Sequence, residues 1–132
     1  WVEAGQVRWA HGRAPLAQPP SHAALLPALG ATAWPRVEIV TSHAGADGAL
    51  VDWLVEKGAR GIVATATGNG TLHKALEAAL ARAVAAGVAV RVALRCPQGR
   101  MLDVHDAPWQ GADGLSPVKA RISLMLELMR SP

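Results

Sequence analysis

The sequence predicts an α/β fold in which a mainly parallel β-sheet lies between layers of helices. From residue 35 onward, short apolar runs typical of strands alternate with segments whose apolar residues recur at helical spacing. One such run, residues 61–66, is apolar without polar alternation, as expected for a strand that is covered on both faces. This alternation favours right-handed crossovers in a flavodoxin-like or Rossmann-like arrangement, which binds ligands in loops beyond the strand ends. The three candidate loops are therefore residues 42–47, 67–71 and 95–115.

Composition and charge limit the classes of function. A chain of 132 residues with 51% apolar and 17% charged residues fits one globular domain. The net charge of +3 comes from basic residues that are scattered along the chain, so we expect no nucleic-acid partner. No apolar run reaches the roughly 18–20 residues that a bilayer span requires, so we expect no membrane partner either.

The first part of the chain differs from the rest because prolines recur through it. Val7, Trp9 and Ala10 near two glycines predict the edge strand of a short hairpin, and the prolines that follow exclude the interior of a sheet. We therefore expect residues 1–34 to be the tail of a preceding domain and a linker, and residues 35–132 to be the α/β domain. The chain begins without an initiator methionine, which suggests a piece of a longer protein.

The α/β segment opens with a strand and a helix. A β-branched run over residues 37–40 predicts a strand that ends at Thr41 and Ser42. Asp47 can cap the helix that follows, and Gly58 supplies a left-handed position after its end. The apolar positions of this helix are Leu50, Val51, Leu54 and Val55.

A second helix and a third strand follow the apolar run at residues 61–66. Thr71 can cap this helix, Gly87 closes it, and residues 88–94 have the pattern of a strand. The helix stripe that we expect to pack on the sheet is Leu72, Leu76, Leu80 and Val84.

A long connection and a final helix complete the pattern. Residues 95–115 form a connection of a length that usually carries function or mobility. Ser116 and Pro117 then provide a cap and a proline at the first helical position. The apolar stripe expected for this helix is Val118, Ile122, Met125, Leu126 and Met129.

The glycine turn at residues 67–71 is the most informative segment. It joins a strand tip to a helix start, where unpaired backbone N–H groups and the positive end of a helix dipole could bind an anion or a carboxylate. A tight turn with a threonine cap needs the same glycines, and the residues alone favour that simpler interpretation. The segment matches neither a phosphate-binding P-loop nor a dinucleotide fingerprint.

Several segments together point to a family. Arg60-Gly61-Ile62-Val63 followed by Thr67-Gly68-Asn69-Gly70-Thr71 resembles the pattern of bacterial asparaginases. Further segments that resemble the C-terminal domain of that family, in sequence and spacing, are Lys74-Ala75-Leu76, Gly87-Val88-Ala89-Val90, Arg95-Cys96-Pro97-Gln98-Gly99 and Leu115-Ser116-Pro117-Val118-Lys119-Ala120-Arg121-Ile122. The resemblance covers residues 35–129, and the order of the segments makes it specific.

The resemblance implies an amidohydrolase that converts asparagine to aspartate and ammonia through a threonine nucleophile in an N-terminal domain, which this chain does not contain. In that family the C-terminal domain contributes to the site of a neighbouring subunit through a polar residue after the glycine turn and an acidic residue in the later loop. Thr71 matches the first position, where many members have Asn. Asn69 and Gly70, which precede it in the same turn, are further candidates for substrate binding. Asp103 and Asp106 are the candidates for the acid, although the loop here is shorter than in typical members.

The resemblance also implies partners and conditions. We expect an amide substrate, a homodimer or tetramer, no cofactor and no metal. A cytoplasmic location is expected, with the periplasm left open. Covalent catalysis needs an activated hydroxyl and a base, and no such pair can be recognised here, so we expect this chain alone to be inactive.

Histidines and the single cysteine are weaker candidates. His105 could form an acid–base pair with Asp106 or a metal site with Asp103, but a solvated loop histidine is favoured because the spacing matches no metal motif. His43, near the tip of the first strand, is a candidate ligand contact. Cys96 is expected to be a small buried hydrophobe.

The tryptophans and the remaining functional classes leave alternatives open. Trp34 and Trp53 are expected in the core, whereas Trp109 in the long connection suits a partner subunit, the core or a lid equally. The alternatives to the amidohydrolase are a stand-alone domain that captures a small anion at residues 68–71, an assembly domain, and a subunit of an amidotransferase of the same family.

Overall fold

The computed structural model describes residues 2–7, 33–96, 101 and 107–130. It contains two compact units, Trp1–Thr32 and Ala33–Pro132. In the first, β1 (Val2–Glu3) pairs antiparallel with β2 (Gln6–Val7). The turn between them has two residues at positive φ, Ala4 and Gly5, as a tight hairpin requires. This confirms the expected hairpin, although Trp9 and Ala10 lie outside the described residues.

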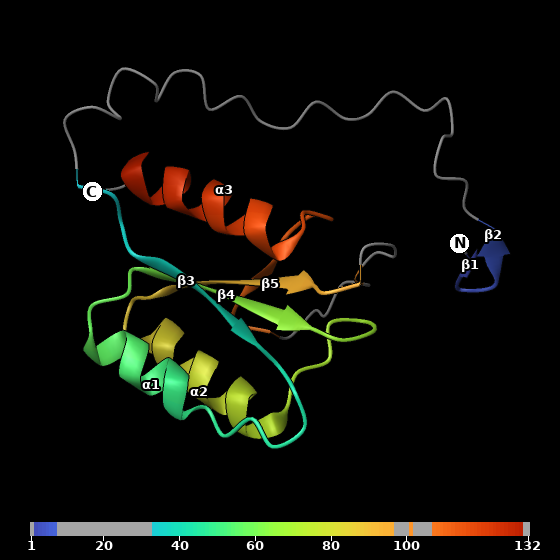
Figure 1. Ribbon diagram of the computed structural model, residues 1–132, viewed down its shortest axis with the longest axis horizontal. Coiled ribbons are helices and arrows are strands. Elements are labelled where there is room, and N and C mark those ends of the chain that lie inside the picture. Colours follow the sequence, from blue (N-terminus) through green and yellow to red (C-terminus); the bar gives the residue numbers. More distant parts are fainter. Residues whose placement is uncertain (1, 8–32, 97–100, 102–106, 131–132) are drawn as a thin grey trace. The chain divides into compact units, whose positions relative to one another are not determined.

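The second unit is a four-stranded parallel sheet between two layers of helices, as predicted (Figure 1). The order is β3 (Val37–Thr41), β4 (Gly61–Ala66), β5 (Ala89–Leu94) and β6 (Gln110–Gly111). All three pairings are parallel, so the carboxyl ends of the strands lie along one edge. Every residue of β4 is buried, which explains why its sequence shows no polar alternation.

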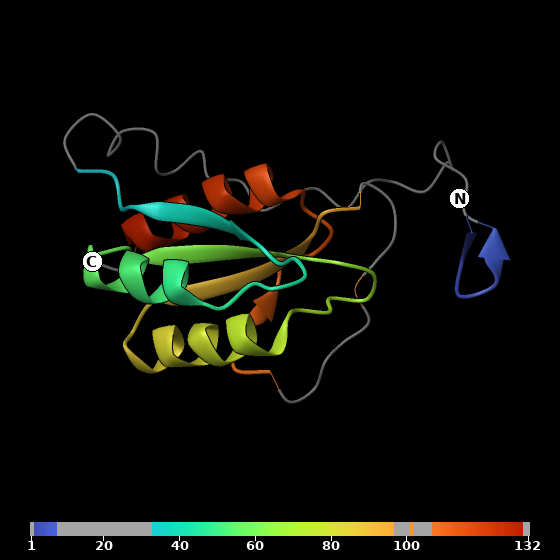
Figure 2. The same cartoon turned by 60° about the horizontal axis from the view of Figure 1, so that its bottom comes forward.

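Two helices cover one face of the sheet, as Figure 2 shows. They are α1 (Ala49–Glu56) and α2 (Lys74–Ala85), and they pack on the alternate strand residues that point toward them. Leu76 and Leu80 of the expected α2 stripe are fully buried in this core. Gly58 and Gly87 lie at positive φ after the two helices, as predicted.

The start of α2 differs from the sequence-based expectation. The N-cap is His73 rather than Thr71, and its Nδ1 accepts a hydrogen bond from the Ala75 backbone N–H at 3.4 Å. Thr71 instead pairs back with Thr67 in an isolated bridge. Because both backbone groups of Thr71 are used in that bridge, the helix begins three residues later.

The first helix also starts slightly differently. Gly48 is its N-cap, in a left-handed conformation with φ of 85°. Asp47 lies one residue earlier, and its Oδ1 accepts the Ala49 backbone N–H at 3.0 Å. The aspartate therefore satisfies a free amide of the first turn from outside the cap position.

The third helix, α3 (Pro117–Arg130), covers the opposite face of the sheet. Ala120, Leu124 and Met125 are its buried residues. Of the predicted stripe, Met125 is buried, but Val118 and Ile122 are exposed, because α3 turns its alanine side toward the sheet. The sequence pattern therefore located the helix correctly but assigned its buried face only in part.

Polar contacts fix α3 along the sheet. Arg121 Nε donates to the Val37 carbonyl of the edge strand at 2.7 Å, and Arg91 of β5 forms an ion pair with Glu127 at 2.9 Å. The arginine of the Lys-Ala-Arg segment thus has a structural role here, because it satisfies a carbonyl of edge strand β3.

Three expectations about burial are wrong. Trp34 and Trp53 are about half exposed rather than in the core. The Trp53 ring lies under the Arg36 guanidinium, 5.6 Å from its centroid, so an exposed position still provides a favourable contact. Cys96 is exposed because it follows the last residues of β5 at the open edge of the sheet.

Candidate functional site

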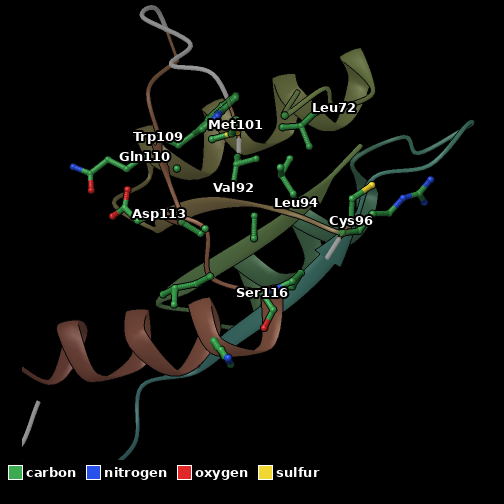
Figure 3. A pocket seen from close by; sticks show the side chains of 18 of the residues that line it. Leu72, Val92, Leu94, Cys96, Met101, Trp109, Gln110, Asp113 and Ser116 are labelled. Atoms are coloured by element: carbon green, nitrogen blue, oxygen red, sulfur yellow. The ribbon is translucent and has the colours of Figure 1, made fainter. Parts of the chain in front are cut away.

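A cavity of the α/β unit lies at the carboxyl edge of the sheet, where two of the predicted loops meet. Its volume is about 820 Å³. Gly70 and Leu72 border it from the turn after β4, and Arg95 and Cys96 border it from the end of β5. Residues 109–117 also line the cavity, and Figure 3 shows Ser116 at the opposite end of it from Met101 and Trp109. Two of the three loops expected to carry a site are therefore brought together.

The third predicted loop forms a separate, smaller cavity. It measures about 280 Å³ and lies between the tip of β3 and the start of α1. His43 and Asp47 both line it, and the His43 ring nitrogen Nδ1 lies 2.9 Å from the Ala44 carbonyl oxygen. A ligand contact through His43 stays a prediction.

The glycine turn is closed by its own backbone. The N–H groups of Gly70 and Thr71 both donate to the Thr67 carbonyl, at 3.1 and 3.0 Å, and the Thr67 N–H donates to the Thr71 carbonyl at 3.2 Å. Gly68 and Gly70 have φ of 51° and 86°, which a residue with a side chain adopts only with strain. The Gly70 and Thr71 N–H groups, which an anion-binding turn would direct at its ligand, are therefore used inside the turn. This favours the interpretation that the glycines serve a tight turn.

Thr71 is exposed at the end of this turn, beside the cavity-lining residues Gly70 and Leu72. Its backbone N–H and carbonyl are both used within the turn. Its hydroxyl is used by none of these turn contacts, so it is the group of Thr71 that is suited to address a ligand.

A serine from the neighbouring strand holds the residues after the turn. Ser42 is buried, and its backbone N–H donates to the Thr65 carbonyl of β4 at 2.9 Å. The Ser42 hydroxyl oxygen accepts the His73 backbone N–H at 2.9 Å. Ser42 thus links the tips of β3 and β4 to the start of α2.

A methionine from the long connection covers the turn on its other side. A Cβ atom on Gly70 would lie 2.8 Å from Met101 Cγ, and one on Gly111 would lie 2.7 Å from Met101 Cε. Both distances are far below normal contact, so the methionine side chain lies directly against two glycine backbones. Trp109, like Met101, is partly buried and packs against the core beside α2 (Figure 3). This contact agrees with the predicted core role, and its roles at a partner subunit or in a lid stay predictions.

The charges around the cavity are mixed. Arg95 and Lys119 are basic, whereas Glu77 and Asp113 are acidic. A zwitterionic ligand with both an ammonium and a carboxylate group suits such a lining better than an ion of one sign.

The nucleophilic side chains of the described lining are the thiol of Cys96 and the hydroxyl of Ser116. The same lining contains no histidine that could take a proton from either group. Among residues 2–7, 33–96, 101 and 107–130, no group of three His, Cys, Asp or Glu side chains could hold a metal ion. In the same part of the chain, no helix has the length and apolar character that crossing a membrane would need.

Of the other predicted site residues, the structure describes Asn69 but not the acidic candidates. Asn69 is exposed within the turn, next to Gly70. Asp103, Asp106 and His105 lie outside the described residues, so the predicted acid stays a prediction. Sequence reasoning did not assign Ser42 or Met101 to the site, and no sequence pattern marks either residue.

Comparison with known proteins agrees with the fold. A family described as the glutaminase/asparaginase C-terminal domain matches residues 36–131. Among solved structures, the chain resembles a probable cytoplasmic L-asparaginase from Campylobacter jejuni, with 31% sequence identity and a TM-score of 0.71. The match covers 77% of this chain but only 32% of that protein. No curated protein matches the chain.

Proposed function

Because the chain belongs to the family of glutaminase/asparaginase C-terminal domains, we propose that it is the C-terminal part of an enzyme that hydrolyses L-asparagine to L-aspartate and ammonia. The observation that carries the proposal is the family match over residues 36–131, which includes the glycine turn and every element of the α/β unit from β3 to α3. The likeness to a probable L-asparaginase at 31% identity supports the amide substrate.

The two parts of the chain and the preceding domain have different roles in this proposal. Residues 35–132 are the C-terminal domain, and residues 1–34 are the tail of a preceding domain with its linker. The nucleophilic threonine belongs to that preceding domain, since the lining described here has no hydroxyl or thiol paired with a base. Thr71 and Asn69 address the substrate from the exposed end of the turn, while Gly70 gives the turn its shape. Asp103 or Asp106 supplies the charge opposite the substrate ammonium group.

The contribution of Thr71 is made to a neighbouring subunit of a homodimer or tetramer. The exposure of Thr71 supports this, because a partner subunit can reach its side chain. The C. jejuni protein is described as cytoplasmic, and that description supports the same location for this protein.

Ammonia release is the direct test of the reaction. The full-length protein that contains this chain is expected to release ammonia from L-asparagine, whereas residues 1–132 alone are expected to release none. A coupled ammonia assay with L-asparagine and L-glutamine as substrates measures both. Turnover by residues 1–132 alone would contradict the placement of the nucleophile, and an inactive full-length protein would contradict the reaction.

Replacing Thr71 by valine in the full-length protein is expected to raise KM for asparagine about 3- to 10-fold while kcat changes less than about twofold. The loss corresponds to one hydrogen bond of roughly 0.5–1.5 kcal/mol that substrate and transition state share equally. Steady-state kinetics measure it. Thr71→Ser keeps the hydroxyl and should retain the original KM.

Two controls sharpen this result. Thr41→Val changes another exposed threonine at a strand tip, and it should leave KM unaltered because Thr41 ends β3 and lies outside the turn that carries Thr71. In mixed oligomers, a Thr71→Val subunit combined with a subunit that lacks the nucleophile should regain the original KM, because one complete shared site forms. A KM that stays high in every mixture would show that Thr71 serves its own subunit.

A further inference from the structure

We propose that Ser42 and Met101 are positioning residues for the turn that carries Thr71. Ser42 holds the turn from the end of β3, and Met101 holds it from the connection after β5. The inference rests on the proposed function for its consequence in substrate binding. Its structural part stands independently, on contacts that join three separate segments of the chain.

The turn contains two glycines and is closed through Thr67. The hydrogen bonds that Thr67 makes with Gly70 and Thr71 measure 3.0–3.4 Å. Nothing lies within 4 Å of the position where Gly68 would carry a Cβ atom. Glycines lose the most conformational freedom when they are fixed, so a turn with two of them needs external contacts to stay in one conformation.

Ser42 supplies the polar contact. It is 4% exposed, and its backbone is fixed by a hydrogen bond to the Thr65 carbonyl of β4. The Ser42 hydroxyl projects from this fixed backbone and accepts a hydrogen bond from the His73 N–H at 2.9 Å. It therefore fixes the position of His73. His73 lies two residues after Thr71, so this bond fixes the point at which the chain leaves the turn. Since His73 also caps α2, the contact aligns the turn with the helix.

Met101 supplies the apolar contact. It comes from the connection after β5 and lies against Gly70, one residue before Thr71. The approach is possible only because residues 70 and 111 both lack a side chain, and a methionine is flexible enough to fill such a gap. Thr71 thus lies between Gly70, which Met101 covers, and His73, which Ser42 binds.

The expected consequence is a turn that is preorganised before substrate arrives. Loosening it should weaken binding of substrate and transition state together, which raises KM more than it lowers kcat. A residue that merely stabilised the fold would lower the amount of active enzyme and leave KM unchanged.

The experiment compares two truncations, Ser42→Ala and Met101→Ala, with two conservative variants, Ser42→Thr and Met101→Leu, in the full-length protein. Hydrogen exchange followed by mass spectrometry measures peptides that cover residues 66–74, and steady-state kinetics measure KM and kcat for L-asparagine. Ser123→Ala and Met129→Ala are matched controls, since both residues are half-buried on α3 and neither borders the cavity.

Each truncation is expected to speed exchange in residues 66–74 about 10-fold and to raise KM on the order of 3- to 10-fold, with kcat within about twofold. The conservative variants should have an exchange rate and a KM close to those of the unmodified protein, and the control variants should change neither value. Unaltered exchange in both truncations would overturn the structural part. Faster exchange with an unaltered KM would overturn the role in substrate binding. If the unmodified protein hydrolyses no amide, the proposed function fails, and the exchange data still decide whether Ser42 and Met101 hold the turn.

Discussion

Replacing Gly48 by alanine is expected to lower the free energy of unfolding by about 3 kcal/mol. Gly48 has φ of 85°, and placing a residue with a side chain in that conformation costs about 1–2 kcal/mol. The new Cβ atom would also lie 2.6 Å from Ala79 Cβ and 2.9 Å from the Ala75 carbonyl oxygen. Both atoms belong to α2, so relief requires the helix to move, and such overpacking costs a further 1–3 kcal/mol or so. Urea unfolding of the variant and of the unmodified chain measures the difference.

Gly58→Ala is the matched control for this prediction. Gly58 has a similar φ of 77°, but nothing lies within 4 Å of the position its Cβ atom would take. It should therefore lose only the conformational part, about 1–2 kcal/mol. If the two variants lost equal stability, the close approach of α1 and α2 at Gly48 would have no energetic importance.

Replacing Leu124 by alanine is expected to cost about 3 kcal/mol, within the range of roughly 2–5 kcal/mol found for buried leucines. Leu124 is 2% exposed and belongs to the core between α3 and the sheet. It lies over Gly61, whose Cβ atom would be 3.0 Å from Leu124 Cδ2, so the cavity left by truncation would open directly onto the sheet backbone. Thermal and urea unfolding both measure the loss.

Ile122→Ala tests the assignment of the buried face of α3. Ile122 is 44% exposed, so truncation should cost less than about 1 kcal/mol. The sequence pattern placed Ile122 on the buried stripe and did not include Leu124. A larger loss for Ile122→Ala than for Leu124→Ala would mean that the helix is rotated relative to the structure described here.

Most of the fold could be predicted because local signals and burial agree. The uninterrupted apolar run of β4 predicted a strand covered on both faces, and all six of its residues are buried. Gly58 and Gly87 predicted the ends of α1 and α2, because a left-handed residue after a helix favours glycine whatever surrounds it. These features depend on a few neighbouring residues, and a sequence displays such residues directly.

The errors arose where a distant contact decides the outcome. Thr71 has a side chain suited to an N-cap, but its pairing with Thr67 and the bond from His73 to Ser42 moved the start of α2. In α3, alanine and leucine positions face the sheet because Gly61 and Ala93 leave room for a close approach. The two-residue strand β6 went unrecognised within the long connection, because its pairing with β5 is its only regular feature.

The sequence by itself determined the fold class, the order of elements and the family resemblance, because hydrophobic periodicity and glycine positions are local properties. Only the tertiary structure decided which loops form the cavity and how Thr71 is held. Ser42 and Met101 lie 29 and 30 residues away from Thr71 along the chain, and neither has a pattern that marks it. Their contacts arise because parallel strands bring their carboxyl ends to one edge, where segments far apart in the sequence meet.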